Sequence, residues 1–280
     1  MRVLTYNING FRSAAGKGLF GWLANEAADI VCFQETRAAE QHLPPVLIEL
    51  PGYRAHWHSA EKKGYSGVGL LSREKPDRVV HGLGDALHDR EGRLLRADFG
   101  DLSVLSLYVP SGITGEARQA HKHEFLGRLL DHLKALKAEG REVLLCGDLN
   151  IAHRVIDLSS PGRSQTTSGF LPAERAWLDS LLAAGFEDVF RRVVGEEPGH
   201  YTWGTAWMKK SGGGWRLDYQ IATPKLSELA RAAHIEKTAP YSDHYPVRID
   251  YDWPIARRAA AGAGDISITS SSSGSPPRPS

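Results

Sequence analysis

Four polar residues closely follow short apolar runs of the sequence, at the points where β-strands are expected to end. Asn7 follows one run, Glu35 follows a second, and Asp148 and Asn150 follow a third. Side chains at the ends of neighbouring strands can converge on one rim of a sheet, which is where α/β proteins usually build sites. The sequence therefore predicts a cluster of carboxylate and amide groups at one edge of the fold.

Glu35 is the strongest candidate for a metal ligand. A carboxylate so close to the apolar run at residues 30–33 risks partial burial, and it then needs a cation or hydrogen-bond donors. Magnesium prefers oxygen ligands and usually takes one or two protein carboxylates together with a substrate phosphate. A divalent ion at Glu35, with the carbonyl oxygen of Asn7 beside it, would meet this need.

Each motif taken alone also has a plain structural interpretation. Asp148-Leu149-Asn150 is typical of a turn, because Asp and Asn side chains bond to their own backbone. Ser242-Asp243-His244 fits a loop or a helix start, and Tyr108-Val109-Pro110 fits a strand that ends at a proline. A function can therefore be inferred only from the motifs in combination.

The elements that must position these side chains alternate between strands and helices. Runs rich in β-branched or aromatic residues predict strands at residues 3–6, 30–33, 67–71, 102–109, 143–146, 217–222 and 246–249. Apolar residues at helical spacing predict one helix within residues 115–139 and another over residues 177–182 that ends near Gly185. This alternation implies sheet covered by helices.

The composition is that of an ordinary water-soluble globular protein. The 280 residues are 41% hydrophobic and 24% charged, and 34 Lys and Arg against 33 Asp and Glu leave a formal net charge of +1. This balance excludes a polybasic binder, so any surface for a polyanion must be local. Residues 1–253 are interpreted as one domain, whereas residues 254–280, rich in Ala, Gly, Ser and Pro, are expected to form a disordered tail.

Membrane insertion and disulfide bonding are both unexpected. No apolar stretch approaches the roughly 18 residues needed to cross a bilayer, and residues 1–10 lack the apolar region of a signal peptide. We therefore expect a cytoplasmic protein with no membrane partner. Cys32 and Cys146 lie inside apolar runs and are expected to be buried free thiols.

Six motifs occur in a fixed order along the chain: Asn7-Ile8-Asn9-Gly10, Gln34-Glu35-Thr36, Tyr108-Val109-Pro110, Gly147-Asp148-Leu149-Asn150, Gly214-Trp215-Arg216-Leu217-Asp218-Tyr219 and Ser242-Asp243-His244. Together they resemble the exonuclease III family of apurinic/apyrimidinic endonucleases, within the endonuclease/exonuclease/phosphatase superfamily. The resemblance covers essentially all of residues 1–251. It implies a four-layered α/β sandwich of the DNase I-like kind, with two packed, mainly antiparallel or mixed β-sheets flanked by helices.

The resemblance also implies hydrolysis of DNA phosphodiester bonds with Mg²⁺ or Mn²⁺. Asn7 and Glu35 match the main metal site of the family, with Asp243 close by. Asp148, Asn150 and His244 match residues described either as a second metal site or as catalytic groups without a metal. Both one ion and two ions remain open at this point.

The catalytic roles follow from the needs of phosphodiester hydrolysis, which requires a base for the attacking water and donors for the phosphate. Asp148 is the expected base, held by Asn150. His244, paired with Asp218, is expected to donate a charge-assisted hydrogen bond to a phosphate oxygen, and Tyr108 supplies another donor. In the alternative assignment, His244 is the base and Asp218 orients it.

Substrate-binding residues are assigned chiefly by alignment with the family. Trp203, Trp215 and Leu217 match positions that line a pocket for a flipped deoxyribose without a base. The competing interpretation is that these aromatic side chains belong to the core. The remaining expected contacts with duplex DNA are Asn9 of the first motif, Trp207 as a wedge, and the basic pair Lys209 and Lys210.

Some positions depart from the family pattern. Ser111 stands where many relatives have Asn or Gln, Gly204 replaces a frequent Trp, and the loop at residues 206–214 is short and rich in glycine. Loops of this kind set the balance between cleavage 5′ to abasic sites and trimming of 3′ ends, so the sequence leaves that balance open.

The expected function is a monomeric repair nuclease acting on duplex DNA with abasic sites or damaged 3′ ends. Two alternatives compete with it. One is a superfamily phosphatase or phospholipase that acts on a phosphoester outside nucleic acid. The other is a non-catalytic DNA-binding scaffold, whose expected sign would be a missing ligand or base.

Overall fold

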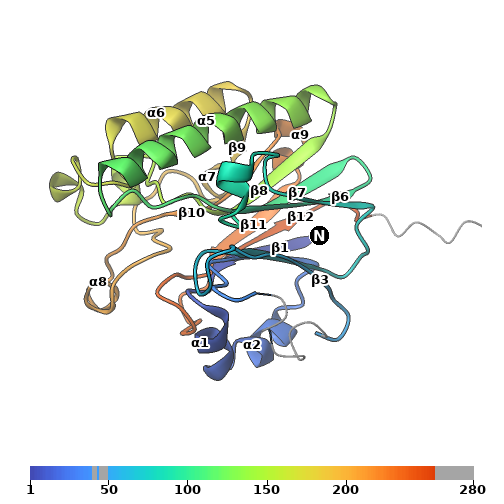
Figure 1. Cartoon of the computed structure of the whole chain (residues 1–280). Coiled ribbons are helices and arrows are strands. Elements are labelled where there is room, and N and C mark those ends of the chain that lie inside the picture. Colours follow the sequence, from blue (N-terminus) through green and yellow to red (C-terminus); the bar gives the residue numbers. More distant parts are fainter. Residues whose placement is uncertain (40–42, 44–49, 256–280) are drawn as a thin grey trace, which may run out of the picture.

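Two β-sheets are stacked face to face with helices on both outer sides, in a computed structural model that describes residues 1–39, 43 and 50–255 (Figure 1). In this part of the chain the first sheet has the order β11–β12–β1–β2–β4–β3 and the second has the order β5–β6–β7–β8–β10–β9. Both sheets are mixed, because β1 and β2 are parallel, as are β7 and β8, while the other pairs are antiparallel. The predicted four-layered sandwich is confirmed.

The strands of the first sheet are β1 (Arg2–Asn7), β2 (Ile30–Gln34), β3 (Arg54–His58), β4 (Val68–Ser72), β11 (Ala230–Ile235) and β12 (Val247–Tyr251). Those of the second are β5 (Arg78–His81), β6 (Leu94–Phe99), β7 (Leu102–Tyr108), β8 (Glu142–Asp148), β9 (Glu187–Asp188) and β10 (Asp218–Ala222). The described helices are α1 (Phe11–Gly16), α2 (Leu19–Glu26), α4 (Ala86–Asp89), α5 (Glu116–Ala138), α6 (Pro172–Ala183), α7 (Val189–Val194), α8 (Ala206–Lys210) and α9 (Pro224–Glu228), with 3₁₀ turns at Val155–Asp157 and Pro161–Arg163.

Three hydrophobic cores separate the layers. The central core lies between the sheets and contains Cys32 and Cys146, both buried free thiols as expected. A second core packs α5 and α6 on the outer face of the second sheet, and a third packs α1 and α2 on the outer face of the first (Figure 1). The apolar face of α5, predicted from its leucine spacing, is buried through Phe125, Leu129 and Leu133.

Buried amides join the two sheets through directional hydrogen bonds. Gln220 of β10 donates to the carbonyl oxygens of Val3 at 3.0 Å and Val247 at 3.1 Å, both in the first sheet. Gln34 of β2 donates to Ser106 Oγ of β7 at 3.3 Å. Since a buried amide is stable only when its hydrogen bonds are made, these contacts specify how one sheet lies on the other.

All seven strands predicted from the sequence are present within two residues of their expected bounds. Four of the five missed strands, β3, β5, β9 and β11, are sheet edges, whose exposed faces carry charged residues instead of an apolar run. The fifth, β6, was missed because Arg96 and Asp98, which form a buried ion pair, interrupt its apolar run in the sequence. The predicted helix end is also present, since Gly185 adopts φ +84° just beyond α6.

The domain boundary predicted at residues 253 and 254 lies close to the last described residue. Residues 254 and 255 follow β12 without regular structure, and the rest of the expected tail, residues 256–280, lies outside the described residues. Among the described helices, none is both long enough and apolar enough to span a membrane.

A buried ion network fixes the loop that follows β8. Asp157 accepts hydrogen bonds from Arg216 Nε at 2.7 Å and Arg191 Nη2 at 2.6 Å, and Arg216 also bonds to Asp188 at 2.7 Å. Burial alone would raise the pKa of Asp157, but the two guanidinium groups lower it to about 2. Arg216 lies between Trp215 and Leu217, so the network holds the segment that carries both residues.

The stability that Asp157 contributes is expected to depend on pH. Its pKa in the folded state lies below the ordinary value of 3.8, so this contribution is complete above about pH 5 and is lost as pH falls toward 2. The deficit of Asp157→Asn in free energy of unfolding, relative to the unsubstituted protein, should therefore shrink by about 2 kcal/mol between pH 7 and pH 2.

Urea denaturation across this pH range measures that difference. Asp252→Asn is the matched control, because Asp252 and its partner Arg231 form an exposed pair, and such pairs contribute about 0–1 kcal/mol. A deficit of Asp157→Asn that stays constant with pH would contradict the network.

Candidate active site

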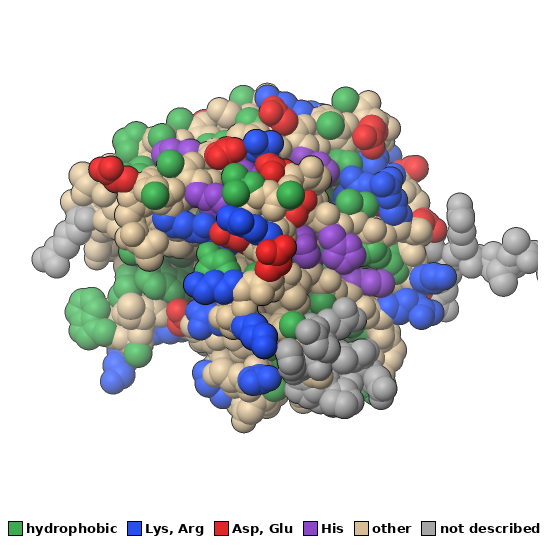
Figure 2. Space-filling view, viewed as in Figure 1, with side chains coloured by type: hydrophobic (Ala, Val, Ile, Leu, Met, Phe, Trp, Pro, Cys, Tyr) green, Lys and Arg blue, Asp and Glu red, His purple; other side chains and the backbone are tan. Residues whose placement is uncertain are grey.

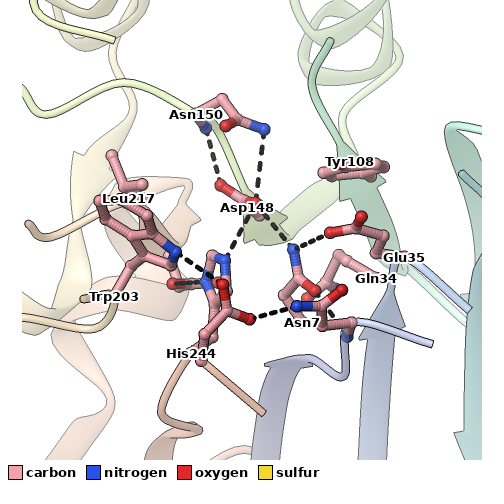
Figure 3. A network of polar contacts seen from close by, with 12 residues as sticks. Asn7, Gln34, Glu35, Tyr108, Asp148, Asn150, Trp203, Leu217 and His244 are labelled. Carbon is pink, nitrogen blue, oxygen red and sulfur yellow. Dashed lines mark hydrogen bonds and ion pairs between the residues drawn. The ribbon is translucent and has the colours of Figure 1, made fainter. Parts of the chain in front are cut away.

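Strand register brings the expected residues together at one end of both sheets. In the first sheet Asn7 lies opposite Gln34, the residue before Glu35. In the second sheet Asp148 is flanked by Tyr108 on one side and Asp218 on the other. Figure 3 shows Asn7, Glu35, Tyr108 and Asp148 pointing toward one common space.

Asn7 links the two halves of this cluster. Its side-chain nitrogen donates to Glu35 Oε2 at 3.1 Å and to Asp148 Oδ2 at 2.9 Å (Figure 3). Its carbonyl oxygen, which is predicted to face a metal, accepts a hydrogen bond from the backbone N–H of Asn9 at 3.0 Å. In this arrangement Asn7 positions two carboxylates relative to each other.

A tight turn after β8 presents Asp148 and holds its carboxylate. The backbone N–H of Asn150 donates to Asp148 Oδ1 at 2.8 Å, and the Asn150 side chain donates to Val109 O at 2.9 Å. Asn150 adopts φ +50°, a left-handed conformation that Asn tolerates. Glycine is required at position 147, directly before Asp148, because a Cβ there would lie 1.9 Å from the carbonyl oxygen of Leu107.

His244 lies between two carboxylates. Its Nδ1 is 2.8 Å from Asp218 Oδ2, and its Nε2 is 3.8 Å from Asp148 Oδ2. Burial alone would lower the pKa of His244, but the charges of Asp218 and Asp148 raise it to about 9. Burial raises the pKa of Asp148 to about 7, opposed by His244. The imidazole is therefore a cationic donor at neutral pH.

Tyr108 completes the site from the second sheet. Burial raises the pKa of its phenol well above the ordinary value, and the negative charges of Glu35 and Asp148 add to this effect. The guanidinium of Arg93 lies 4.8 Å from the Tyr108 ring centroid and donates to the Tyr108 carbonyl oxygen. Tyr108 therefore stays protonated and can donate a hydrogen bond.

Asp243 fixes two neighbours of the catalytic cluster. One of its carboxylate oxygens accepts from the Asn9 side chain at 2.7 Å, and the other accepts from the indole N–H of Trp203 at 3.0 Å. Burial would raise the pKa of Asp243, but the charge of His244 and these two donors lower it. Asp243 thus lies beside the cluster, with both oxygens already bonded to protein groups.

The cluster forms one wall of a cavity of about 360 Å³. Trp203, Trp215 and Leu217 line it as expected, and so does Asn9. The same three residues also pack on a small apolar cluster with Phe170 and Leu158, so the core and pocket interpretations both apply to them. Lining residues that the sequence did not single out for this cavity are Arg37, Ser111, Ile113, Thr167, Ser168, Gly169 and Met208.

The residues expected to contact DNA from α8 differ in their surroundings. The side chain of Trp207 is 77% exposed, and hydrophobic side chains project from this helix in Figure 2. Lys209 instead lies with its Nζ 3.8 Å from the Tyr245 ring centroid and donates to the Ser242 carbonyl oxygen at 3.4 Å. Lys210 is exposed. None of these three residues lines the cavity of the catalytic cluster.

The donor set fits a hard divalent cation held by oxygen atoms. Glu35 and Asp148 offer carboxylates, and the potential ligand atoms of Asp148, Asp218 and His244 lie within 4.8 Å of one another. A protonated His244 has no lone pair to give a metal. The carboxylates, with Glu35 first among them, are the groups that would hold the ion.

The fold and this site together define a phosphoester hydrolase of the α/β-sandwich class. The chain belongs to the Endonuclease/Exonuclease/phosphatase family, whose model matches residues 4–244. This confirms the membership predicted from the motifs.

Two curated relatives and one solved structure place the chain more closely. It is 36% identical over 253 residues to the DNA repair nuclease APEX1 of Danio rerio, covering 89% of this chain and 81% of that protein. It is 35% identical over 255 residues to an exodeoxyribonuclease of Bacillus subtilis (strain 168), covering 89% and 98% respectively. An AP endonuclease structure from Archaeoglobus fulgidus matches with a TM-score of 0.82 at 30% identity, covering 90% of this chain and 100% of that one.

A buried ion pair between α5 and α6 contacts the turn after β8 that carries Asp148 and Asn150. Lys122 of α5 and Glu174 of α6 are fully buried, and Lys122 Nζ lies 2.6 Å from Glu174 Oε1. The same ammonium group donates to the Asn150 carbonyl oxygen at 2.8 Å. Glu174 also accepts from the backbone N–H groups of Gly169 at 2.7 Å and Leu171 at 3.0 Å. The pair therefore fixes the turn and the cavity wall relative to each other.

Lys122→Met is expected to lower the free energy of unfolding by about 3 kcal/mol, because it leaves Glu174 as an unpaired buried charge. The double variant Lys122→Met/Glu174→Gln should lose less than the sum of the two single losses, since neither charge then remains. Urea denaturation of the three variants measures this coupling. Additive losses would show that the two side chains do not support each other.

Proposed function

We propose that this chain is a DNA repair nuclease that hydrolyses phosphodiester bonds 5′ to abasic sites and trims blocked 3′ ends of duplex DNA. We further propose that it acts as a monomer in the cytoplasm. The observation that carries the proposal is the convergence of Glu35, Asp148 and His244 beside a cavity with apolar walls. The curated relatives, which are named as repair nucleases and exodeoxyribonucleases, support the same assignment.

Glu35 would hold Mg²⁺ or Mn²⁺, which neutralises charge on the non-bridging oxygens of the phosphate when bound. Asp148 takes the proton of the attacking water, because its hydrogen bonds come from neutral amides that keep it in place. His244 faces Asp218 through Nδ1, so its Nε2 is the atom that donates to the phosphate. Tyr108 donates to the phosphate or to the leaving 3′ oxygen.

Substrate selection would come from the shape of the cavity. Trp203, Trp215 and Leu217 form an apolar wall that accepts a sugar without a base and offers little to the polar edge of a normal nucleotide. Trp207, which is exposed on α8, would insert into the duplex, and the exposed Lys210 would contact its phosphate backbone.

The test is incubation of the full chain with a 5′-labelled duplex that carries one tetrahydrofuran abasic analogue, with Mg²⁺ and with EDTA. Incision 5′ to the analogue in Mg²⁺ alone is the expected result. Retention of uncut duplex in both conditions would indicate a non-catalytic scaffold. Turnover of an inositol phosphate or a phospholipid, with no cut in DNA, would indicate a different branch of the family.

Asp148→Asn is expected to lower turnover by a factor on the order of 10²–10⁴, the usual contribution of a general base, while its affinity for the duplex stays nearly the same. Single-turnover incision and fluorescence anisotropy measure the two quantities. The control is Asp252→Asn, which removes an exposed acid that does not line the cavity. Turnover close to that of the unsubstituted enzyme would remove Asp148 from the role of base and favour His244.

A further inference from the structure

Arg37 occupies the carboxylate that is the first candidate for holding the divalent ion. Its Nε donates to Glu35 Oε1 at 2.9 Å, and its Nη2 contacts the same oxygen. The other oxygen, Oε2, accepts from the Asn7 side chain. Both oxygens of Glu35 therefore have protein partners, and Arg37 is the charged one.

The backbone between these two residues is firmly held. Glu35 and Arg37 both adopt left-handed conformations, with φ of +54° and +51°. The Glu35 carbonyl oxygen accepts from the N–H of Gly10 at 2.8 Å, and the N–H of Arg37 donates to Ser66 O at 2.8 Å. The Arg37 side chain, which is 45% exposed, is consequently the part of the pair that can turn without disturbing the chain.

Arg37 also stands between two hollows of the surface. It lines the catalytic cavity and a second hollow of about 720 Å³, which we name the basic cleft and whose charged residues are Arg12, Arg37, Glu61, Lys62 and Lys63. Figure 2 shows Lys and Arg side chains gathered across the middle of the face that it views. If Arg37 leaves Glu35, its guanidinium can therefore turn into the basic cleft, where the positive charges attract phosphate oxygens.

A divalent ion and a guanidinium cannot share Glu35 Oε1. Two like charges about 4 Å apart repel each other by an amount that matters even in a partly solvated site, and the ion carries twice the charge. The guanidinium also blocks the approach of the ion to that oxygen. Binding of one at Glu35 is therefore expected to exclude the other.

We propose that Arg37 and the divalent ion are alternative partners of Glu35, and that the ion releases Arg37 to bind a DNA phosphate in the basic cleft. This inference rests on the proposed function for the presence of the ion and the DNA. Arg37 would keep Glu35 neutralised while the ion is absent, and it would contribute to substrate binding only once the site is loaded. Binding of the ion at Glu35 and binding of the DNA phosphate are thereby coupled through the Arg37 side chain.

The first test measures Mn²⁺ binding to the full chain without DNA, by the electron paramagnetic resonance signal of free Mn²⁺. Arg37→Gln is expected to bind Mn²⁺ about tenfold more tightly than the unsubstituted protein, because it removes a competing cation. Lys62→Gln is the matched control, since it removes one positive charge from the basic cleft without touching Glu35. Mn²⁺ should also raise the melting temperature of Arg37→Gln more than that of the control.

The outcomes separate this inference from the proposed function. If Arg37→Gln binds Mn²⁺ no more tightly than Lys62→Gln, while Glu35→Gln loses binding, the exchange is rejected and the metal site stands. If Glu35→Gln binds Mn²⁺ as well as the unsubstituted protein does, the ion lies elsewhere and the metal site of the proposed function fails with it.

The second test follows the destination of Arg37, in an Asp148→Asn background that prevents cleavage. The slope of log affinity for duplex DNA against log salt concentration counts phosphate contacts. Replacing Arg37 by Gln should reduce this slope by about one in Mn²⁺ and leave it unchanged in EDTA. An equal change in both conditions, or no change in Mn²⁺, would refute the release of Arg37 onto the phosphate.

Discussion

The whole site depends on the position of one sheet relative to the other. Asn7 and Glu35 end strands of the first sheet, whereas Tyr108, Asp148 and Asp218 belong to the second. Apolar packing between the sheets is strong but non-directional, so it alone does not fix their alignment. The buried amides of Gln34 and Gln220 supply that direction, because a slip of either sheet would leave their hydrogen bonds unmade. Asn7 extends the same principle to the rim, where it bonds to one carboxylate from each sheet.

Asp148 differs from the other acids of the site in the groups that donate hydrogen bonds to it. Glu35 has a guanidinium, Asp218 has the imidazole of His244, and Asp243 has two neutral donors outside the centre. Asp148 is the most central carboxylate, and its hydrogen bonds come only from the amides of Asn7 and Asn150. Its nearest cation, the imidazole of His244, lies 3.8 Å away and makes no hydrogen bond to it. An acid that is held in place by neutral amides is well suited to accept a proton.

The sequence predicted most of the site because strand ends are visible in a linear pattern. Glu35 and Asp148 each follow an apolar run, and this pattern led us to expect them at strand ends, where side chains can converge on one rim. The same pattern does not tell which way the Asn7 side-chain amide points, because its orientation depends on neighbours from both sheets. Lys122 is a lysine in a helix with many polar residues, and nothing nearby in sequence marks Glu174, 52 positions away, as its partner. The sequence likewise did not mark Arg37 as a site residue, because its contact with Glu35 and its position between the two hollows are visible only in the fold.

The pairing of the first and last described strands has a consequence for how the protein is made. β1 is central in its sheet, and one of its two neighbours is β12, which ends at Tyr251; the ammonium group of Met1 donates to the Tyr251 carbonyl oxygen at 2.8 Å. His244 lies just before β12. During translation, β1 therefore emerges before the other strands of the domain and keeps an open edge until β12 has been synthesised. Nascent chains should therefore lack a working centre until β12 has left the exit tunnel and paired with β1.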